Sequence, residues 1–251
     1  DLPTEKLELL APLGIRQLVM VPFTAELAAL SPEAFVARVL RDQLQARRVA
    51  VGENFRFGAG RAGTAADLVR LGEACGMEVR VLPLLADGGG RGSSSRIRRA
   101  LLEGDLAEAA RLLERPYRFG GRVVAGRGLG RTIGWPTANL RVDGRKFLPR
   151  LGVYAVRVWL AGEPQTPLAG VMNLGPQPTV DPEAPSAVEV HLLDPQRFTI
   201  ERGDQPLDLR DAELIVEPVR YLRDQQRFAG LEELRAAIAA DAEAAAAILA
   251  A

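Results

Sequence analysis

The sequence predicts a two-domain α+β protein, in which an α/β domain precedes a small barrel or sandwich of antiparallel strands. Helical and extended patterns alternate through residues 1–115, short β-rich runs separated by Gly and Pro follow, and an Ala-rich helix closes the chain. Alternating strands and helices are typical of a parallel sheet, whereas short strands at close spacing are typical of barrels and sandwiches. We therefore expect one domain over residues 1–115 and a second over residues 116–251.

The first domain is expected to start its sheet at residues 15–21, an apolar run typical of a buried parallel strand. Ser31 and Pro32 then open a helix, because Ser is a favoured N-cap and Pro suits the first helical position. Further strands are expected at residues 48–51 and 77–85, and further helices at residues 64–75, 95–103 and 106–113.

The second domain shows five β-rich runs, at residues 121–125, 153–160, 168–174, 187–193 and 212–219. Turns rich in Gly and Pro separate them, which indicates short antiparallel strands. Residues 231–250 are expected to form the closing helix, whose larger apolar residues are Leu231, Leu234, Ile238 and Ile248.

The composition excludes several classes of partner. Acidic and basic residues balance at 32 each, so the chain lacks the basic excess typical of nucleic-acid binding. No apolar run approaches the roughly 18 residues that span a bilayer. The single cysteine, Cys75, cannot form an internal disulfide, which fits a cytoplasmic location. A nucleophilic Cys75 would need a histidine partner, and the only histidine, His191, lies far away in the sequence.

A glycine-rich turn is the first candidate binding motif. Gly126, Gly128 and Gly130 lack the Cβ atoms that would keep the backbone away from a phosphate group. Arg127 and Arg131 offer hydrogen bonds to phosphate oxygens. Such a turn alone is also compatible with an ordinary loop.

The segment that follows strengthens the case for a nucleotide site. Thr137 and Asn139, which follow Pro136, lie two residues apart and therefore share one face if the segment is extended. A hydroxyl and an amide oxygen are hard neutral ligands, suited to Mg²⁺ whose charge is already balanced by ATP phosphates.

The stretch from Gly126 to Leu140 resembles the signature of riboflavin kinases. Further motifs follow in the order typical of that family, namely GVYA from Gly152, GVMNLG followed by PT from Gly170, and EVHLLD from Glu189. Trp135 stands where the family usually has Phe or Tyr, so an aromatic ring is retained. Phe228 and the helix from Leu231 resemble the end of the family's sequence.

The resemblance implies a six-stranded antiparallel barrel with flavin and ATP meeting at one end. It implies phosphate transfer from ATP to riboflavin, with FMN as product. By the same resemblance Glu189 is the general base, and Thr137 and Asn139 hold Mg²⁺ and the phosphates. The remaining phosphate contacts would come from Gly126, Gly128, Gly130, Arg131 and Pro136.

The chemistry of these residues agrees with that assignment. Phosphoryl transfer needs a metal, a positioned hydroxyl and a base within hydrogen-bond reach. Without the motif, Glu189 would be interpreted as a solvent-facing residue of an alternating strand. His191 shares a strand face with Glu189, because side chains alternate with a period of two, and it is more simply a structural hydrogen-bonding residue than a catalyst.

Residues 1–115 resemble the nucleotidyltransferase half of bacterial bifunctional FAD synthetases, which implies an incomplete Rossmann-like domain. The segments GENFRFG from Gly52 and SSSRIR from Ser93 carry this resemblance. It implies ATP phosphate contacts for Ser94, Ser95 and Arg98, and a place near the nucleotide or flavin for Asn54. The alternatives are a plain helix cap for the serines and core packing for the two Phe residues of the first segment.

One departure limits the second activity. The family's opening strand and its His-x-Gly-His motif, which serves adenylyl transfer, do not occur in this chain. We therefore expect a missing N-terminal segment, little or no adenylylation of FMN by this chain, and a bifunctional parent protein.

Two alternatives to the kinase remain. The first is a flavin-binding regulatory protein on the same barrel without catalysis, suggested by the absent part of the adenylyltransferase machinery. The second is a nucleic-acid-binding barrel, but the sequence shows neither the basic stripe nor the aromatic ladder that such a barrel needs. The presence of Thr137, Asn139 and Glu189 together favours the enzyme, since a binding protein needs no base.

Overall fold

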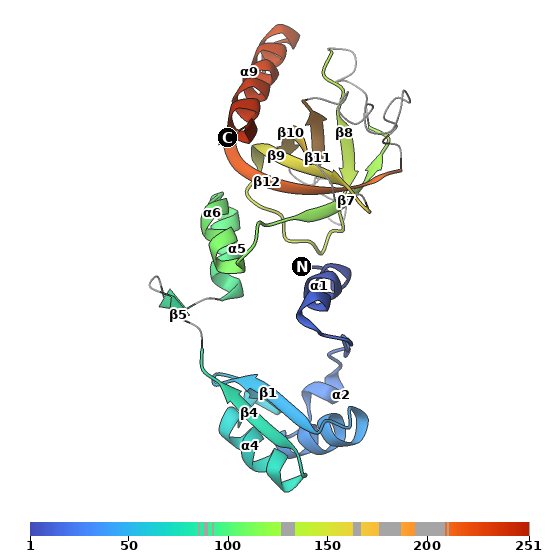
Figure 1. Cartoon of the computed structure of the whole chain (residues 1–251), viewed down its shortest axis with the longest axis vertical. Helices are drawn as coiled ribbons and strands as arrows, with labels where there is room; N and C mark the ends of the chain where they lie inside the picture. Colours follow the sequence, from blue (N-terminus) through green and yellow to red (C-terminus); the bar gives the residue numbers. More distant parts are fainter. Residues whose placement is uncertain are drawn as a thin grey trace. The chain divides into compact units, whose positions relative to one another are not determined.

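The computed structural model describes residues 1–84, 93–126, 134–162, 167–175, 187–193, 209 and 211–250, and the backbone of residues 86–87 and 90–91 (Figure 1). The chain divides into two compact units. One comprises Leu7–Gly92, and the other comprises Asp1–Lys6 together with Ser93–Ala251.

The unit Leu7–Gly92 is built on a parallel pair of strands. β1 (Arg48–Gly52) pairs with β4 (Glu78–Leu82), and helix α4 (Ala65–Ala74) connects them. The remaining elements are α2 (Ala25–Ala28), α3 (Pro32–Ala34), the π-helix η2 (Phe35–Gln43), the 3₁₀ turns η1 (Ala11–Leu13) and η3 (Ala59–Arg61), and the two-residue strands β2 (Arg56–Phe57), β3 (Gly63–Thr64), β5 (Ala86–Asp87) and β6 (Gly90–Arg91).

Local sequence signals account for the helix starts in this unit. Ser31 caps α3, because its hydroxyl accepts a hydrogen bond from the Ala34 amide at 3.2 Å. Thr64 and Asp67 form a reciprocal capping box at the start of α4. The predicted helices at these positions are therefore confirmed. Phe57 lies in the core of this unit, which agrees with the packing alternative for that residue.

The expected first strand is wrong. Residues 15–21 form no strand, and the side chains of Ile15, Val19, Met20 and Val21 are 44–60% exposed. The run has strand-like composition, but a strand also needs a neighbour for its backbone N–H and C=O groups. No strand among the described residues pairs with it, so composition alone does not produce the element.

The second unit contains a closed barrel. Its strands are β7 (Phe119–Val124), β8 (Ala138–Arg141), β9 (Gly152–Leu160), β10 (Leu168–Leu174), β11 (Val188–Leu192) and β12 (Glu213–Arg223). They close in the order β10-β11-β8-β7-β12-β9, and every neighbouring pair is antiparallel. The six-stranded antiparallel barrel is therefore confirmed.

Side-chain alternation gives the barrel a filled interior. Leu140, Val188, Val190, Met172 and Tyr154 point inward and belong to one buried cluster. The residues between them point to the outer wall. The interior is a packed core, so any binding site on these strands must lie outside it.

Helices cover parts of this unit. α9 (Leu231–Ala250) lies against β9 and β10 (Figure 1). Its Ala245 packs with Val153, Ala155 and Val171 on the outer wall of these strands. Its bounds match the predicted helix. The helices α5 (Ser94–Glu103) and α6 (Leu106–Leu113), also as predicted, contribute apolar side chains to the barrel's buried cluster.

The first residues of the chain also belong to the barrel unit. They include the start of α1 (Pro3–Leu10), which carries Glu5. Both carboxylate oxygens of Glu5 accept hydrogen bonds from Lys146 Nζ at 2.7 Å, and the Lys146 side chain is only 1% exposed. Burial lowers the pKa of the Lys146 ammonium, which the Glu5 carboxylate opposes.

Candidate active site

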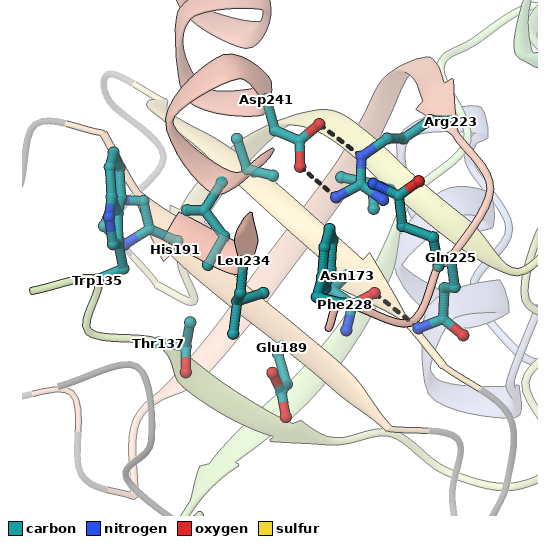
Figure 2. Close-up of a pocket in the computed structure, with 14 residues that line it drawn as sticks. Trp135, Thr137, Asn173, Glu189, His191, Arg223, Gln225, Phe228, Leu234 and Asp241 are labelled. Atoms are coloured by element: carbon teal, nitrogen blue, oxygen red, sulfur yellow. Dashed lines mark hydrogen bonds and ion pairs between the residues drawn. The ribbon is translucent and has the colours of Figure 1, made fainter. Parts of the chain in front are cut away.

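A pocket of about 340 Å³ lies between the outer wall of the barrel and α9 (Figure 2). Part of its lining is apolar and part is polar. The apolar side chains are Trp135, Val153, Val171, Phe228, Leu234 and Ile238, and the polar ones are Thr137, Asn173, Glu189, His191, Arg223, Gln225, Gln226 and Asp241.

The register of the strands places Glu189 at the centre of a polar row. Glu189 on β11 lies directly opposite Asn139 on β8 and Asn173 on β10. Residues paired across antiparallel strands point to the same face, so the three side chains share the outer wall. The neighbours of Glu189, Val188 and Val190, are buried inside the barrel. Glu189 therefore faces the pocket.

Thr137 completes this polar group. It comes immediately before β8, and Figure 2 shows its hydroxyl and the Glu189 carboxylate at the same end of the pocket. The family resemblance implied that these groups meet at one end of the barrel. The structure places them on the outer wall beneath α9, because core side chains fill the interior.

Gly126 lies against Asn139. A Cβ atom at residue 126 would be 2.1 Å from Asn139 Nδ2 and 2.5 Å from Asn139 Cγ, so any side chain there would force the Asn139 amide or the backbone to move. The chain entering the glycine-rich segment therefore packs directly on the Asn139 amide. Asn139 itself does not line the pocket, but it lies directly opposite Glu189, which does.

His191 contacts the segment that carries Thr137. Its Nδ1 atom lies 2.8 Å from the carbonyl oxygen of Pro136. Its ring also meets the Trp135 ring edge to face, with 4.9 Å between the ring centroids.

Two further polar contacts shape the pocket wall. Gln225 Nε2 donates a hydrogen bond to Asn173 Oδ1 at 2.7 Å. The guanidinium of Arg223, at the end of β12, donates to both carboxylate oxygens of Asp241 on α9, at 2.9 and 2.7 Å. The second contact is a bidentate ion pair that joins α9 to the barrel. Sequence reasoning missed both, since their partners lie 52 and 18 residues apart and carry no local pattern.

The donor set at the polar end suits a metal that arrives with a nucleotide. Within the described part of the chain, no three His, Cys, Asp or Glu side chains gather as a metal-binding cluster. Thr137 and Glu189 offer a hydroxyl and a carboxylate oxygen in the pocket, and Asn139, opposite Glu189 in the strand register, offers an amide oxygen beside it. Such ligands fit Mg²⁺ that already carries phosphate oxygens.

The remaining predicted residues of the kinase site fall into two groups. Gly128, Gly130 and Arg131, like Arg127, lie outside the described residues. Pro136 lies beside the pocket, held by its carbonyl oxygen as above.

The residues expected to serve adenylyl transfer fall in different units. Asn54 is exposed on the turn after β1, in the unit Leu7–Gly92. Ser94, Ser95 and Arg98 are exposed in the first turns of α5, in the barrel unit. The hydroxyl of Ser93 caps α5 by accepting from the Arg96 amide at 3.3 Å. Because Ser93 is the N-cap, Ser94 and Ser95 do not cap the helix. Their role in ATP binding stays a prediction.

Comparison with known proteins identifies the class. The family model described as riboflavin kinase matches residues 113–249, and the one described as FAD synthetase matches residues 2–96. The chain belongs to the family of bifunctional riboflavin kinase/FMN adenylyltransferases. A member of that name from Escherichia coli K12 is 41% identical over 237 residues, which are 94% of this chain and 71% of the relative. One from Pseudomonas fluorescens is 38% identical, with 94% and 72% covered.

A solved structure supports the fold over nearly the whole chain. A protein from Streptococcus pneumoniae, described as a macrolide-efflux protein, superposes with a TM-score of 0.79 at 30% identity. The superposition covers 97% of this chain and 74% of that one. Among the described residues, no helix is both long and apolar enough to cross a membrane.

Proposed function

We propose that this chain transfers the γ-phosphoryl group of ATP to the 5′-hydroxyl of riboflavin and so makes FMN. One observation carries the proposal. The Glu189 carboxylate and the Thr137 hydroxyl line the same pocket, and Asn139 lies directly opposite Glu189 in the strand register. A base therefore stands next to two oxygen ligands suited to a metal-bound phosphate.

Glu189 acts as the general base. Its carboxylate takes the proton of the 5′-hydroxyl while the hydroxyl oxygen forms a bond to the γ-phosphorus. The bond between the γ-phosphorus and the bridging oxygen to the β-phosphate breaks, and ADP leaves with that electron pair. Glu189 contributes most by holding the hydroxyl in line with the phosphorus.

Thr137 and Asn139 would hold Mg²⁺ together with the phosphates. When bound, that ion neutralises charge developing on the transferred group. The Gly126 backbone lies against the Asn139 amide and so fixes one of the two ligands. Phosphate contacts from Gly128, Gly130 and Arg131 remain part of the proposal on the strength of the sequence motif.

The apolar side of the pocket suits the flavin ring. Aromatic and aliphatic side chains from the barrel wall, from residue 228 and from α9 line it, as is typical of sites for flat hydrophobic ligands. A ring seated there can direct its ribityl chain toward the polar end with Glu189.

Adenylylation of FMN to FAD is the second activity that we propose for the family's full-length proteins, from the match to FAD synthetase over residues 2–96. For this chain we predict little of it, since its only histidine is His191 in the barrel. Incubation with FMN and ATP-Mg, followed by chromatography for FAD, measures this activity directly.

We propose that the two domains divide at residues 115/116. We also propose a cytoplasmic location, which the free thiol of Cys75 fits.

The kinase is tested by incubating the folded chain with riboflavin and ATP-Mg and measuring FMN. We expect FMN from the wild type and a loss of turnover of at least about a hundredfold in Glu189→Gln, with riboflavin binding retained. The matched control is Glu213→Gln, which changes an exposed glutamate of the same barrel outside the pocket. Flavin binding without any ATP consumption by the wild type would instead favour the inactive regulatory protein.

A further inference from the structure

We propose that His191 is a positioning residue, which holds the Trp135–Pro136 segment in place so that Thr137 faces Glu189. This inference rests on the proposed kinase function for its kinetic consequences. The geometry behind it concerns the protein alone.

The backbone ladder stops just before the residues that need to be held. β11 and β8 pair at Val188–Leu140, Glu189–Asn139 and Val190–Ala138, and the described pairing ends there. Continuing the same register by one step sets His191 opposite Thr137. Pro136, one residue further, has no N–H with which to extend the ladder. Main-chain pairing therefore secures Asn139 but does not reach Thr137.

The His191 side chain takes over where the ladder ends. Its Nδ1 atom lies 2.8 Å from the Pro136 carbonyl oxygen. A carbonyl oxygen only accepts hydrogen bonds, so Nδ1 must carry the hydrogen. The neutral ring is then the Nδ1–H tautomer. This bond fixes the peptide group that leads directly into Thr137.

A second contact holds the preceding residue. The rings of His191 and Trp135 meet edge to face, with centroids 4.9 Å apart and planes inclined at 68°. This is a favoured arrangement for aromatic pairs. The imidazole thus contacts two consecutive residues: it stacks edge to face with Trp135 and hydrogen-bonds to Pro136.

Both groups of the proposed reaction thereby depend on one strand. Glu189 and His191 lie two residues apart on the same face of β11. Glu189 presents the base directly, and His191 sets the position of Thr137 through Pro136. A shift of about 1 Å in a positioned group is enough to reduce turnover markedly.

The kinetic test compares His191→Ala with His191→Asn. The Asn side-chain amide places an N–H near the position of Nδ1, so it can restore the bond to Pro136, whereas Ala cannot. We expect His191→Ala to lower kcat/KM for ATP-Mg roughly tenfold or more, and His191→Asn to recover most of that loss. Equal activities for His191→Asn and His191→Ala, in variants that melt like the wild type, would overturn the proposal.

A spectroscopic test is independent of catalysis. His191 is the only histidine, so its ring nitrogens give one unambiguous pair of ¹⁵N signals. At a pH where the ring is neutral, we expect the Nδ1–H tautomer in the ligand-free protein. An Nε2–H tautomer would refute the hydrogen bond to Pro136. Absence of FMN from the wild type would refute the kinase proposal alone, and the ring signals would still decide this one.

Discussion

Gln225 fixes the orientation of the Asn173 amide. The Gln225 Nε2 atom donates to Asn173 Oδ1 at 2.7 Å, which leaves the Asn173 NH₂ group as the free end. Figure 2 shows Asn173 between Gln225 and Glu189. Because Asn173 pairs with Glu189 across the strands, the free end offers hydrogen-bond donors on the side of the carboxylate.

Gln225→Glu should reverse this orientation. A carboxylate at residue 225 can only accept, so the Asn173 NH₂ group would turn toward it and its carbonyl oxygen toward Glu189. We expect kcat for riboflavin phosphorylation to fall roughly tenfold, more than in Gln225→Leu, which removes the bond without reversing it. Steady-state kinetics with saturating ATP-Mg measure the difference. Equal losses in both variants would argue against control of Asn173 by Gln225.

Gly126→Ala should displace the Asn139 side chain. The new Cβ atom would lie 2.1 Å from Asn139 Nδ2, so either the amide or the backbone must move. We expect kcat/KM for ATP-Mg to fall roughly tenfold to a hundredfold, with a smaller change in riboflavin binding. The control is Gly120→Ala on β7, where the nearest atom to a Cβ is 3.6 Å away. A fully active Gly126→Ala enzyme would contradict the close packing as a requirement for function.

Most of the barrel followed from local sequence patterns, and the exceptions have physical causes. Five strands were predicted because alternating or apolar runs lie between turns. The sixth, β8, contains only four residues, and its position was not predicted; the family resemblance implied a sixth strand without locating it. Residues 15–21 were predicted as a strand but form none, because strand-like composition does not supply a partner strand.

The candidate site was predicted only in part, because motifs identify residues but not their neighbours. Thr137 and Asn139 have recognisable spacing, whereas Glu189 was assigned as the base only through the family resemblance. The register that puts Asn139 opposite Glu189 depends on the pairing of β8 with β11. The partners of Asn173 and Asp241, which are Gln225 and Arg223, depend on where the chain turns after β12.

Asp241→Ala should loosen α9 from the barrel. It removes the carboxylate partner of Arg223, whose partly buried guanidinium would keep only the hydrogen bond from Nη1 to the Asp224 carbonyl oxygen at 3.0 Å. The side chains are 27% (Arg223) and 9% (Asp241) exposed. We expect a loss of roughly 2–3 kcal/mol in unfolding free energy and weaker riboflavin binding, since α9 forms one wall of the pocket. Chemical denaturation and flavin fluorescence titration measure these effects.

A control on the same helix separates this from a general effect of charge removal. Glu232→Ala breaks the pair with Arg235, in which the Glu232 side chain is 91% exposed. Exposed pairs contribute little, so stability should change by less than about 0.5 kcal/mol and flavin affinity should not change. A similar destabilisation in both variants would remove the special role of the Arg223–Asp241 pair.

Glu5→Gln should destabilise the barrel unit in a pH-dependent manner. The substitution leaves the buried Lys146 ammonium with the Asp1 carboxylate at 3.6 Å and the Arg118 carbonyl oxygen at 2.9 Å. We expect a loss of roughly 2 kcal/mol near pH 7, below the 3–5 kcal/mol typical of a fully broken buried pair.

The direction of the pH effect follows from the lowered pKa of Lys146, which burial causes. Removing the Glu5 charge lowers the folded-state pKa further, while the unfolded value stays near its usual range. At a pH between the folded-state and the unfolded-state pKa of Lys146, the unfolded chain binds more protons than the folded one. The unfolding free energy therefore rises with pH, and it rises more in Glu5→Gln than in the wild type. Thermal melts between pH 7 and 10 should therefore show the difference in Tm shrinking. In a Lys146→Met background, the Glu5→Gln substitution should change Tm little at any of these pH values. If Glu5→Gln alone lowered Tm by the same amount at every pH, the Lys146 charge would not be the cause.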